Sequence, residues 1–305
     1  MKYKEVIITV FLIAFVIIQN NAQEKEYKIA YQSIAWSPNG KQIFFTAIKV
    51  KPDWSDYSPD KWKLYMYNLN HRKLTEMGFS AIYFSFSPDG KTIAFDKNTS
   101  NNKGIFQRDL KFGEETTLVS DKSKDAGPSW SPDGKLIVFY SNRSGHEELY
   151  TLKINTKEIN QITNSESYKC YNPIWSPNSN LIVYYLEKGD SKDQIWLTDS
   201  KGSFQKNLTN DDHHNIYPSW TPDGRILYVR DKGEVMVMNE DGSNKKMIIE
   251  GKGGLVRMDA TGKKLLLTKG DGNLYVFYLK EKKLEKVMER KQLTQYSSNK
   301  SSTSN

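Results

Sequence analysis

A five-residue segment recurs along this chain at nearly constant spacing, and it restricts the fold more than any other feature. Each copy begins with a large apolar residue and continues with Ser or Thr, Pro, Asp or Asn, and Gly or Ser. The copies are Trp36–Gly40, Phe86–Gly90, Trp130–Gly134, Trp175–Ser179 and Trp220–Gly224, with a weaker sixth at Met258–Gly262. Their first residues are 50, 44, 45, 45 and 38 positions apart. Such a period indicates a repeat protein whose units need their neighbours to bury a core.

The chemistry of the segment predicts a tight turn between two antiparallel strands. Proline fixes the backbone angle φ of the second turn position, and Asp or Asn is tolerated at the third. Glycine then adopts the left-handed conformation that reverses the chain. A strand is expected after each turn, at Gln42–Thr46, Thr92–Asp96, Leu136–Tyr140, Leu181–Tyr185, Ile226–Arg230 and Lys264–Thr268.

Two further strands complete each repeat. The third is expected at Lys63–Leu69, Gly104–Leu110, Glu148–Ile154, Gln194–Thr198, Glu234–Asn239 and Asn273–Leu279. The fourth is expected at Lys73–Glu76, Glu115–Val119, Glu158–Thr163, Gln205–Thr209, Lys245–Ile249 and Lys283–Met288. Four strands in about 45 residues is the size of one propeller blade. The sequence therefore predicts an all-β, six-bladed β-propeller with four-stranded antiparallel blades, each pre-hairpin aromatic packing between blades. An open β-solenoid, the alternative, would use shorter repeats.

The sequence leaves open how the ring closes. Tyr27–Tyr31 at the start and Gln292–Thr294 at the end are additional short segments that could pair with the first or last blade. We expect the propeller to span residues 26–295. The Ser- and Asn-rich segment 296–305 is expected to be a disordered polar tail.

The N-terminal residues read as an export signal. Lys2 and Lys4 precede a 13-residue apolar run from Val6 to Ile18, and the small residue Ala22 follows. This order predicts a signal peptide over residues 1–22 with cleavage after Ala22. As a helix the run covers roughly 20 Å, less than the roughly 30 Å apolar layer of a bilayer. We therefore expect a periplasmic or secreted protein with no stable membrane span after cleavage; an uncleaved anchor is the alternative.

The cysteine content and the charge limit the cellular location and the class of partner that we expect. Cys170 is the single cysteine, so no internal disulfide can form, which suits a bacterial envelope protein stabilised by burial and sheet pairing. The formal net charge is +8, and +7 once Lys2, Lys4 and Glu5 are removed. The excess lysine is spread along the chain, as is typical of solubility and edge protection. We expect a monomer and no nucleic-acid partner, because an exported protein would seldom meet nucleic acid.

The residues around the hairpins carry a family resemblance. In the third repeat the hairpin is followed by Tyr140–Tyr150, YSNRSGHEELY, and the segments Gln194–Leu197 (QIWL) and Asn207–Thr209 (NLT) fit the same template. Over about residues 26–288 the chain resembles the WD-repeat-like propellers of the TolB family. The resemblance implies a binding role, since the family's periplasmic translocation protein is non-enzymatic and binds envelope partners, including a peptidoglycan-associated lipoprotein. That protein has an α/β domain before its propeller, which we expect to be absent here.

One connection is much longer than its counterparts and carries three aromatic side chains. It runs from Ala47 to Trp62 and also contains Trp54 and Tyr57. In a propeller such a connection between second and third strands lies at the end of the blade opposite the hairpin turn, on the same face as the connections between blades. Loops on that face surround the mouth of the central channel, where propellers commonly bind ligands. The rings are candidates for stacking on a sugar or for anchoring a protein partner. The alternative interpretation is that they fold back and cover the first blade.

Two other loops on the same face carry candidate residues. Tyr168, Tyr171 and Tyr217 either add to a recognition surface or pack beneath their loops. His213 and His214 follow two aspartates, and imidazoles and carboxylates are residue types that can bind a metal ion. A metal site needs three or four converging ligands, whereas adjacent residues of an extended loop point apart. A solvated polar loop is favoured, with no metal and no cofactor.

Known catalytic signatures are missing from the sequence. It contains no Gly-rich phosphate loop, no paired-cysteine zinc spacing and no Gly-x-Ser-x-Gly segment. The first hypothesis is an exported, non-catalytic binding scaffold of the bacterial cell envelope that engages a protein partner through its loop face. The alternative is a carbohydrate-binding or carbohydrate-active propeller, either a lyase or a hydrolase. A structural or assembly module is the third reading.

Overall fold

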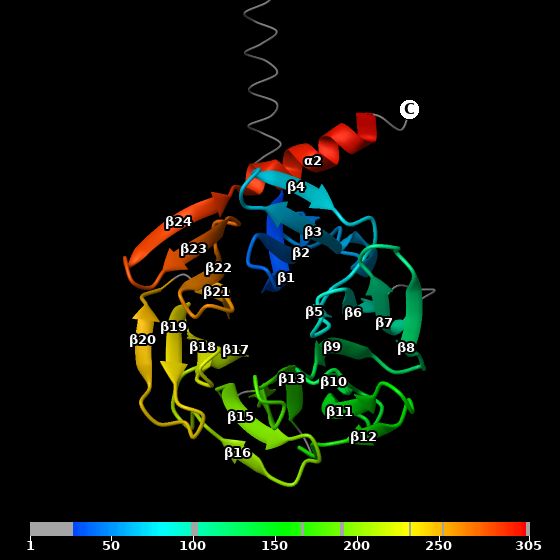
Figure 1. The fold of residues 1–305 in the computed structure, drawn as a ribbon, viewed down its shortest axis with the longest axis vertical. Helices are drawn as coiled ribbons and strands as arrows, with labels where there is room; N and C mark the ends of the chain where they lie inside the picture. The colour runs from blue at the N-terminus through cyan, green and yellow to red at the C-terminus, as the bar shows by residue number, and fades with distance from the viewer. Residues whose placement is uncertain are drawn as a thin grey trace, which may run out of the picture.

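The computed structural model describes residues 27–98, 103–165, 168–189, 192–231, 233–251 and 253–302, which form a closed ring of six sheets (Figure 1). Each sheet has four antiparallel strands in chain order, the first nearest the axis and the fourth at the rim. The predicted six-bladed propeller is confirmed. The predicted signal peptide, residues 1–22, lies outside the described residues.

The strands follow the chain from blade to blade. Blades 1 and 2 contain β1 (Lys28–Trp36), β2 (Gln42–Val50), β3 (Lys63–Asn68), β4 (Lys73–Glu76), β5 (Phe84–Phe86), β6 (Thr92–Asn98), β7 (Lys103–Asp109) and β8 (Glu115–Val119). Blades 3 and 4 contain β9 (Asp125–Trp130), β10 (Leu136–Ser141), β11 (Glu148–Lys153), β12 (Ile159–Gln161), β13 (Lys169–Trp175), β14 (Leu181–Glu187), β15 (Gln194–Asp199) and β16 (Gln205–Asn207). Blades 5 and 6 contain β17 (Asn215–Trp220), β18 (Ile226–Arg230), β19 (Glu234–Met238), β20 (Lys246–Ile249), β21 (Gly253–Met258), β22 (Lys264–Lys269), β23 (Leu274–Tyr278) and β24 (Lys283–Met288). A short 3-10 helix, Pro59–Lys61, precedes β3, and helix α2, Arg290–Ser302, follows β24.

The repeated segment forms the turn that its residues predict. In blade 3 the Ser131 hydroxyl accepts the N–H of Leu136 at 2.9 Å and donates to the Asp133 carboxylate at 2.7 Å. Gly134 has a φ of +73° and donates its N–H to the Ser131 carbonyl at 2.9 Å. The same hydroxyl contact with a strand N–H recurs in blades 1, 2 and 4, at Ser37, Ser87 and Ser176. In blade 5 the Thr221 hydroxyl accepts the N–H of Arg225, the residue just before β18. The side chain thus replaces a missing backbone acceptor at the start of each second strand.

The sixth copy keeps the turn with its hydroxyl and its carboxylate exchanged. Asp259 occupies the position of the serine, and its Oδ1 accepts the N–H of Lys264 at 2.8 Å. Thr261 occupies the position of the aspartate, and its hydroxyl donates to Asp259 Oδ2 at 2.6 Å. Gly262 retains the left-handed φ, at +69°. Blade 6 is therefore complete even though its motif is weak.

The aromatic residue before each hairpin lies between blades, as predicted. The indole N–H groups of Trp36, Trp175 and Trp220 each donate to a backbone carbonyl of the preceding blade at 3.1 Å. Phe86 meets Phe44 of blade 1 edge-on, with 5.0 Å between ring centroids. Each large hydrophobic cluster accordingly joins two neighbouring blades. The core is a set of interfaces rather than a single centre.

Blades 1 and 6 close the ring without exchanging a strand. The Tyr31 hydroxyl donates to the carbonyl of Gly272 at 2.8 Å, and the Trp36 indole spans the same junction. The segment Tyr27–Tyr31 does pair with the first blade, one of the two options left open, but it is not a separate strand. Because β2 continues to Val50, residues 28–31 pair with it and belong to β1.

A helix, not a strand, ends the described chain. The expectation of a strand at Gln292–Thr294 is wrong, because these residues lie in α2, which also extends into the segment 296–305 for which we expected disorder. Leu293 is buried in the cluster of blades 1 and 6. The hydroxyl of Tyr296 accepts the N–H of Glu76 on the edge strand β4 at 3.3 Å. Residues three apart share one face of a helix, so α2 covers this junction with both side chains.

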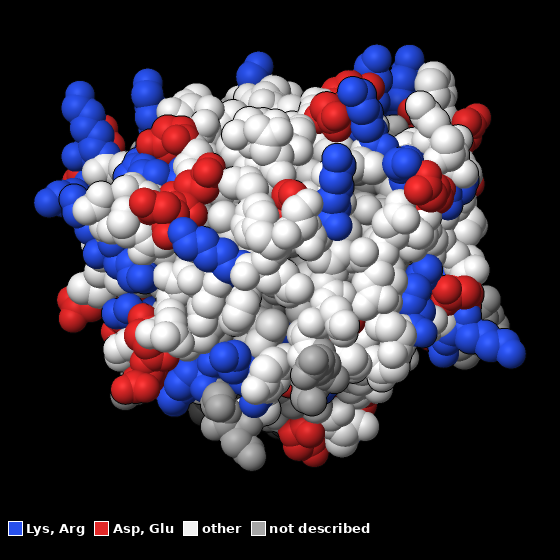
Figure 2. Space-filling model, turned by 90° about the horizontal axis from the view of Figure 1, so that it is seen from below, with Lys and Arg blue, Asp and Glu red and all other residues white. Residues whose placement is uncertain are grey.

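The topology gives the ring two distinct faces. The hairpin turns lie at one end, which we call the hairpin face. The connections between second and third strands and between blades lie at the other end, the loop face. Figure 2 shows the side of the ring that carries β16, where Lys and Arg are interspersed with Asp and Glu. No helix in the described part of the chain is both long enough and apolar enough to cross a membrane.

Candidate binding site on the loop face

The long connection between β2 and β3 has a defined fold. Trp54 has a φ of +60°, which is uncommon for a bulky residue, and its N–H donates to the Lys51 carbonyl at 3.0 Å. The N–H of Lys51 donates to Asp56 at 2.7 Å, and Lys61 Nζ lies 2.8 Å from the same carboxylate. These contacts fix the turn that presents Trp54 and Tyr57 on the loop face.

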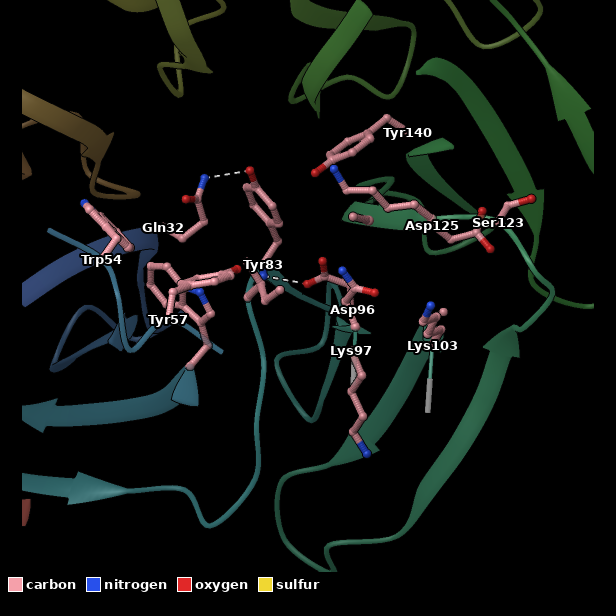
Figure 3. A pocket seen from close by; sticks show the side chains of 16 residues that line it. Gln32, Trp54, Tyr57, Tyr83, Asp96, Lys97, Lys103, Ser123, Asp125 and Tyr140 are labelled. Carbon is pink, nitrogen blue, oxygen red and sulfur yellow. Dashed lines mark hydrogen bonds between the residues drawn. The ribbon is translucent and has the colours of Figure 1, made fainter. Parts of the chain in front are cut away.

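A cavity of about 320 Å³ lies on the loop face where blades 1, 2 and 3 meet (Figure 3). Its aromatic lining consists of Trp54, Tyr57, Trp62, Tyr83 and Tyr140. Its polar lining includes Gln32, Asp96, Lys97, Lys103, Lys124 and Asp125. This volume is at the lower end of the range for small-molecule pockets, so the cavity is large enough for a side chain or a small molecule.

The three aromatic residues of the long connection play different parts. Trp62 is only 4% exposed and packs against Ile48 and Val50, so it covers blade 1 as the alternative interpretation expected. Trp54 and Tyr57 are 40% and 47% exposed, and their ring centroids lie 5.9 Å apart at the rim of the cavity. The exposed pair is therefore the part of this connection that a ligand can reach.

Two buried carboxylates lie at the polar end of the cavity. Asp96, on β6, is 1% exposed; its Oδ1 accepts the N–H of Tyr83 at 2.6 Å. Asp125, at the start of β9, is also buried, and its Oδ1 accepts from Arg143 at 2.7 Å. The second oxygen of each carboxylate is buried without a hydrogen-bond partner among the described residues. Burial raises the pKa of Asp96 to about 7.

Sequence reasoning missed Asp96, although the repeat carries a signal for it. Asp96 stands ten residues after the aromatic that begins its hairpin, where Thr46 and Thr268 stand in blades 1 and 6. The two threonine hydroxyls accept a backbone N–H, as Asp96 does for Tyr83. A hydroxyl suffices for that contact, so the extra oxygen of Asp96 is left for another partner.

Five tyrosines form a continuous belt along the channel near the loop face. They are Tyr83, Tyr140, Tyr171, Tyr185 and Tyr217, from blades 2 to 5, and successive ring centroids lie 6.0, 5.1, 5.6 and 6.0 Å apart. We call them the tyrosine belt. Burial raises the pKa of each of these phenols above its ordinary value. The belt is therefore uncharged at neutral pH.

The three tyrosines predicted as candidate binding residues lie at two separate places in the structure. Tyr171 and Tyr217 belong to the tyrosine belt, Tyr217 with a left-handed φ of +53°. Tyr168 is exposed beside blade 4, with Lys188 Nζ 5.5 Å from its ring centroid. Tyr168 is not among the residues that line the cavity.

The two adjacent histidines turn towards different carboxylates. His213 Nδ1 contacts Asp231, and His214 Nδ1 lies 3.0 Å from Asp193. No group of three or more His, Cys, Asp or Glu side chains placed to hold a metal ion occurs among the described residues. His213 and His214 therefore contact two separate carboxylates in the loop before β17.

The sequence matches the family of the TolB beta propeller domain over residues 13–264. No curated protein matches it.

Similar solved structures include TolB from Acinetobacter baumannii and an oligogalacturonate lyase from Vibrio parahaemolyticus. The first is 19% identical with a TM-score of 0.63, over 84% of this chain and 62% of that chain. The second is 15% identical with a TM-score of 0.59, over 87% of this chain and 80% of that chain. The chain thus spans less than two thirds of the length of that TolB, and identities this low show a common fold alone.

Proposed function

The chain belongs to the TolB beta propeller family, and on that premise we propose that it is an exported, non-catalytic binding protein of the bacterial cell envelope. Its loop face receives a segment of a protein partner. The observation that carries this proposal is the aromatic-walled cavity where blades 1, 2 and 3 meet. Trp54 and Tyr57 stand exposed at its rim on a fixed turn, which is how aromatic anchors are presented in protein interfaces.

The shape of the cavity supports a partner that inserts one side chain. A cavity with a volume of about 320 Å³ is too small for a helix or a strand, but it can hold the end of a long side chain. The surrounding rim would then contact the backbone and neighbouring residues of the inserted segment. Recognition of a short extended segment costs little reorganisation here, because the walls come from three separate blades that are already packed.

The proposal is tested by site-specific photocrosslinking in envelope extracts. A benzophenone amino acid at Tyr57 is expected to trap a defined partner, and the Trp54→Ala substitution in the same protein is expected to reduce the yield several-fold. The matched control places the same amino acid at Phe112, an aromatic residue that is 70% exposed on the hairpin face. Equal trapping from both positions would contradict a specific site on the loop face.

A carbohydrate ligand is the second candidate, because exposed Trp and Tyr rings also stack on sugars. Acidic and neutral oligosaccharides, including oligogalacturonates, separate the two candidates. Saturable binding or turnover that is lost in Trp54→Ala would favour the carbohydrate reading, whereas the protein-partner reading expects neither.

A further inference from the structure

Asp96 is a buried carboxyl group, and only one of its two oxygens has a hydrogen-bond partner among the described residues. Its Oδ1 is occupied by the N–H of Tyr83, while Oδ2 is buried and has no hydrogen-bond partner in the described part of the chain. In Figure 3 the carboxylate is turned towards the space between the Tyr83 and Tyr140 rings. All three residues line the cavity. A buried polar atom without a partner costs free energy, so such an atom facing a cavity indicates a missing ligand group.

The nearby lysines pair with other carboxylates. Lys97 Nζ contacts Glu115 and lies over two phenylalanine rings, and Figure 3 shows its side chain directed away from Asp96. Lys124 Nζ lies 3.7 Å from Glu147 and 5.9 Å from the centroid of the Tyr140 ring. Its charge also reaches Asp96: burial raises the pKa of Asp96, and the Lys124 ammonium lowers it in part. Among the described residues, none forms an ion pair with Asp96 within 4.0 Å.

Arginine and the third lysine also leave Asp96 open. Arg143 divides its guanidinium between Asp125 at 2.7 Å and Asp121 at 3.3 Å. Lys103 is exposed at the start of β7. Of the two buried carboxyl groups at this end of the cavity, Asp125 therefore has an ion-pair partner, and Asp96 has none within 4.0 Å among the described residues.

The walls around Asp96 favour a positive group over a neutral one. The rings of Tyr83 and Tyr140 present electron-rich faces, which attract cations, and neither phenol ionises at neutral pH. The exposed rings of Trp54 and Tyr57 continue this aromatic surface outward to the rim. A carboxylate at the base of an aromatic pocket is a recurrent arrangement for binding ammonium and guanidinium groups.

We propose that this cavity is a recognition pocket for the cationic end of a Lys or Arg side chain of the partner, with Asp96 as its counter-charge. The proposal rests on the proposed function, since it names the chemical group that the partner inserts. The cation completes the hydrogen bonding of Asp96 Oδ2, and its alkyl stem lies along Trp54 and Tyr57.

Binding of the cation is coupled to the protonation of Asp96. With the pocket empty, burial holds the Asp96 pKa near 7, so a fraction of the protein carries a neutral carboxyl group. An inserted cation stabilises the ionised form, lowers that pKa and displaces the proton. Affinity for the cation is therefore expected to be higher at pH 8 than at pH 6.

The experiment uses three capped amino acids as probes of the pocket. Nα-acetyl-lysine and Nα-acetyl-arginine methylamides supply the cation, and the norleucine methylamide supplies a neutral stem. Binding is followed by the indole N–H resonances of Trp54 and Trp62 in the full-length protein at pH 6 and pH 8. We expect at least one cationic probe to bind at millimolar concentration, with affinity that rises at pH 8 and exceeds that of norleucine several-fold.

Asp96→Asn is the decisive variant, because its amide oxygen can still accept the Tyr83 N–H. It is expected to lose the preference for the cationic probe, whereas Asp60→Asn, which changes an exposed carboxylate on the same face, is expected to keep it. Equal binding of lysine and norleucine probes, or an unchanged preference in Asp96→Asn, would overturn the proposal. If crosslinking through Tyr57 persists in that case, the loop-face function stands and only the charge assignment fails. If crosslinking is unspecific, the function itself fails.

Discussion

At the scale of single residues, the informative positions are those where one blade departs from the others. The residue ten positions after the start of the hairpin segment accepts a backbone N–H in blades 1, 2 and 6, through Thr46, Asp96 and Thr268. The N–H lies in the inner strand in blades 1 and 6 and just before it in blade 2. Threonine meets that need without charge. The carboxylate in blade 2 adds a charge to a buried position, and this excess over the structural need is what marks a binding group.

The buried carboxyl group of Asp96 should make the stability of the protein depend on pH. Between about pH 3.8 and 7 the folded protein retains a proton on Asp96 that the unfolded chain has lost, so the free energy of unfolding falls as pH rises. Asp96→Asn removes this dependence. Relative to the wild type, we expect the free energy of unfolding of the variant to increase by up to about 1.4 kcal/mol per pH unit across this window.

Urea unfolding at four pH values from 4.5 to about 7.5 measures the difference. The gap between the two proteins should level off above the Asp96 pKa. Parallel stability profiles would show that Asp96 is ionised throughout and that a nearby positive charge, such as that of Lys124, compensates for its burial.

At the scale of strands and turns, the hairpin segment carries a measurable share of the stability. Ser131→Ala in blade 3 and Asp259→Ala in blade 6 both remove the acceptor for the N–H that opens the second strand. Each is expected to cost about 1–2 kcal/mol, although one residue is a serine and the other an aspartate. Ser144→Ala, at an exposed serine of blade 3, is the matched control and should change stability little.

Chemical denaturation of the three variants provides the measurement. If Asp259→Ala were as mild as the control, the exchange of hydroxyl and carboxylate in blade 6 would be a weaker turn rather than an equivalent one.

The turn chemistry explains why the fold could be predicted so fully from the sequence. Pro and Gly determine the backbone conformation within the four residues of a turn, so the hairpins could be predicted without knowing any distant contact. Ring closure could not be predicted in this way. The role of α2 depends on Leu293 and Tyr296 meeting blades 1 and 6, whose positions follow only from the assembled ring.

The site was predictable in part for the same reason. The long connection and its aromatic residues stand out by length, and Trp54 and Tyr57 do reach one cavity. Gathering them with Tyr83 and Tyr140 requires three blades to be placed around an axis, which no local pattern encodes. The tyrosine belt arises in the same way, from residues of four successive blades, of which blade 4 supplies two.

At the scale of the whole molecule, stability depends on the junction between the first and last blades. Tyr31→Phe removes the hydroxyl that bonds to the Gly272 carbonyl across this junction. We expect a loss of about 1 kcal/mol, because a half-buried carbonyl is left without its donor.

Thermal unfolding of Tyr31→Phe beside Tyr57→Phe, which removes an exposed phenol on the loop face, tests this expectation. The junction variant should melt at a lower temperature than the loop-face variant. Identical melting of the two would mean that α2 and the hydrophobic cluster hold the ring closed without help from this bond.

The direction in which the chain enters the ring has a practical consequence. β1 starts at Lys28 on the loop face, and the Lys28 ammonium lies 4.4 Å from the centroid of the Trp54 ring. Helix α2 instead runs along the outside of the ring (Figure 1). A fusion partner or sensor-chip linkage attached upstream of β1 would stand beside the pocket and mask it, whereas immobilisation through the C-terminus leaves the mouth facing the solution.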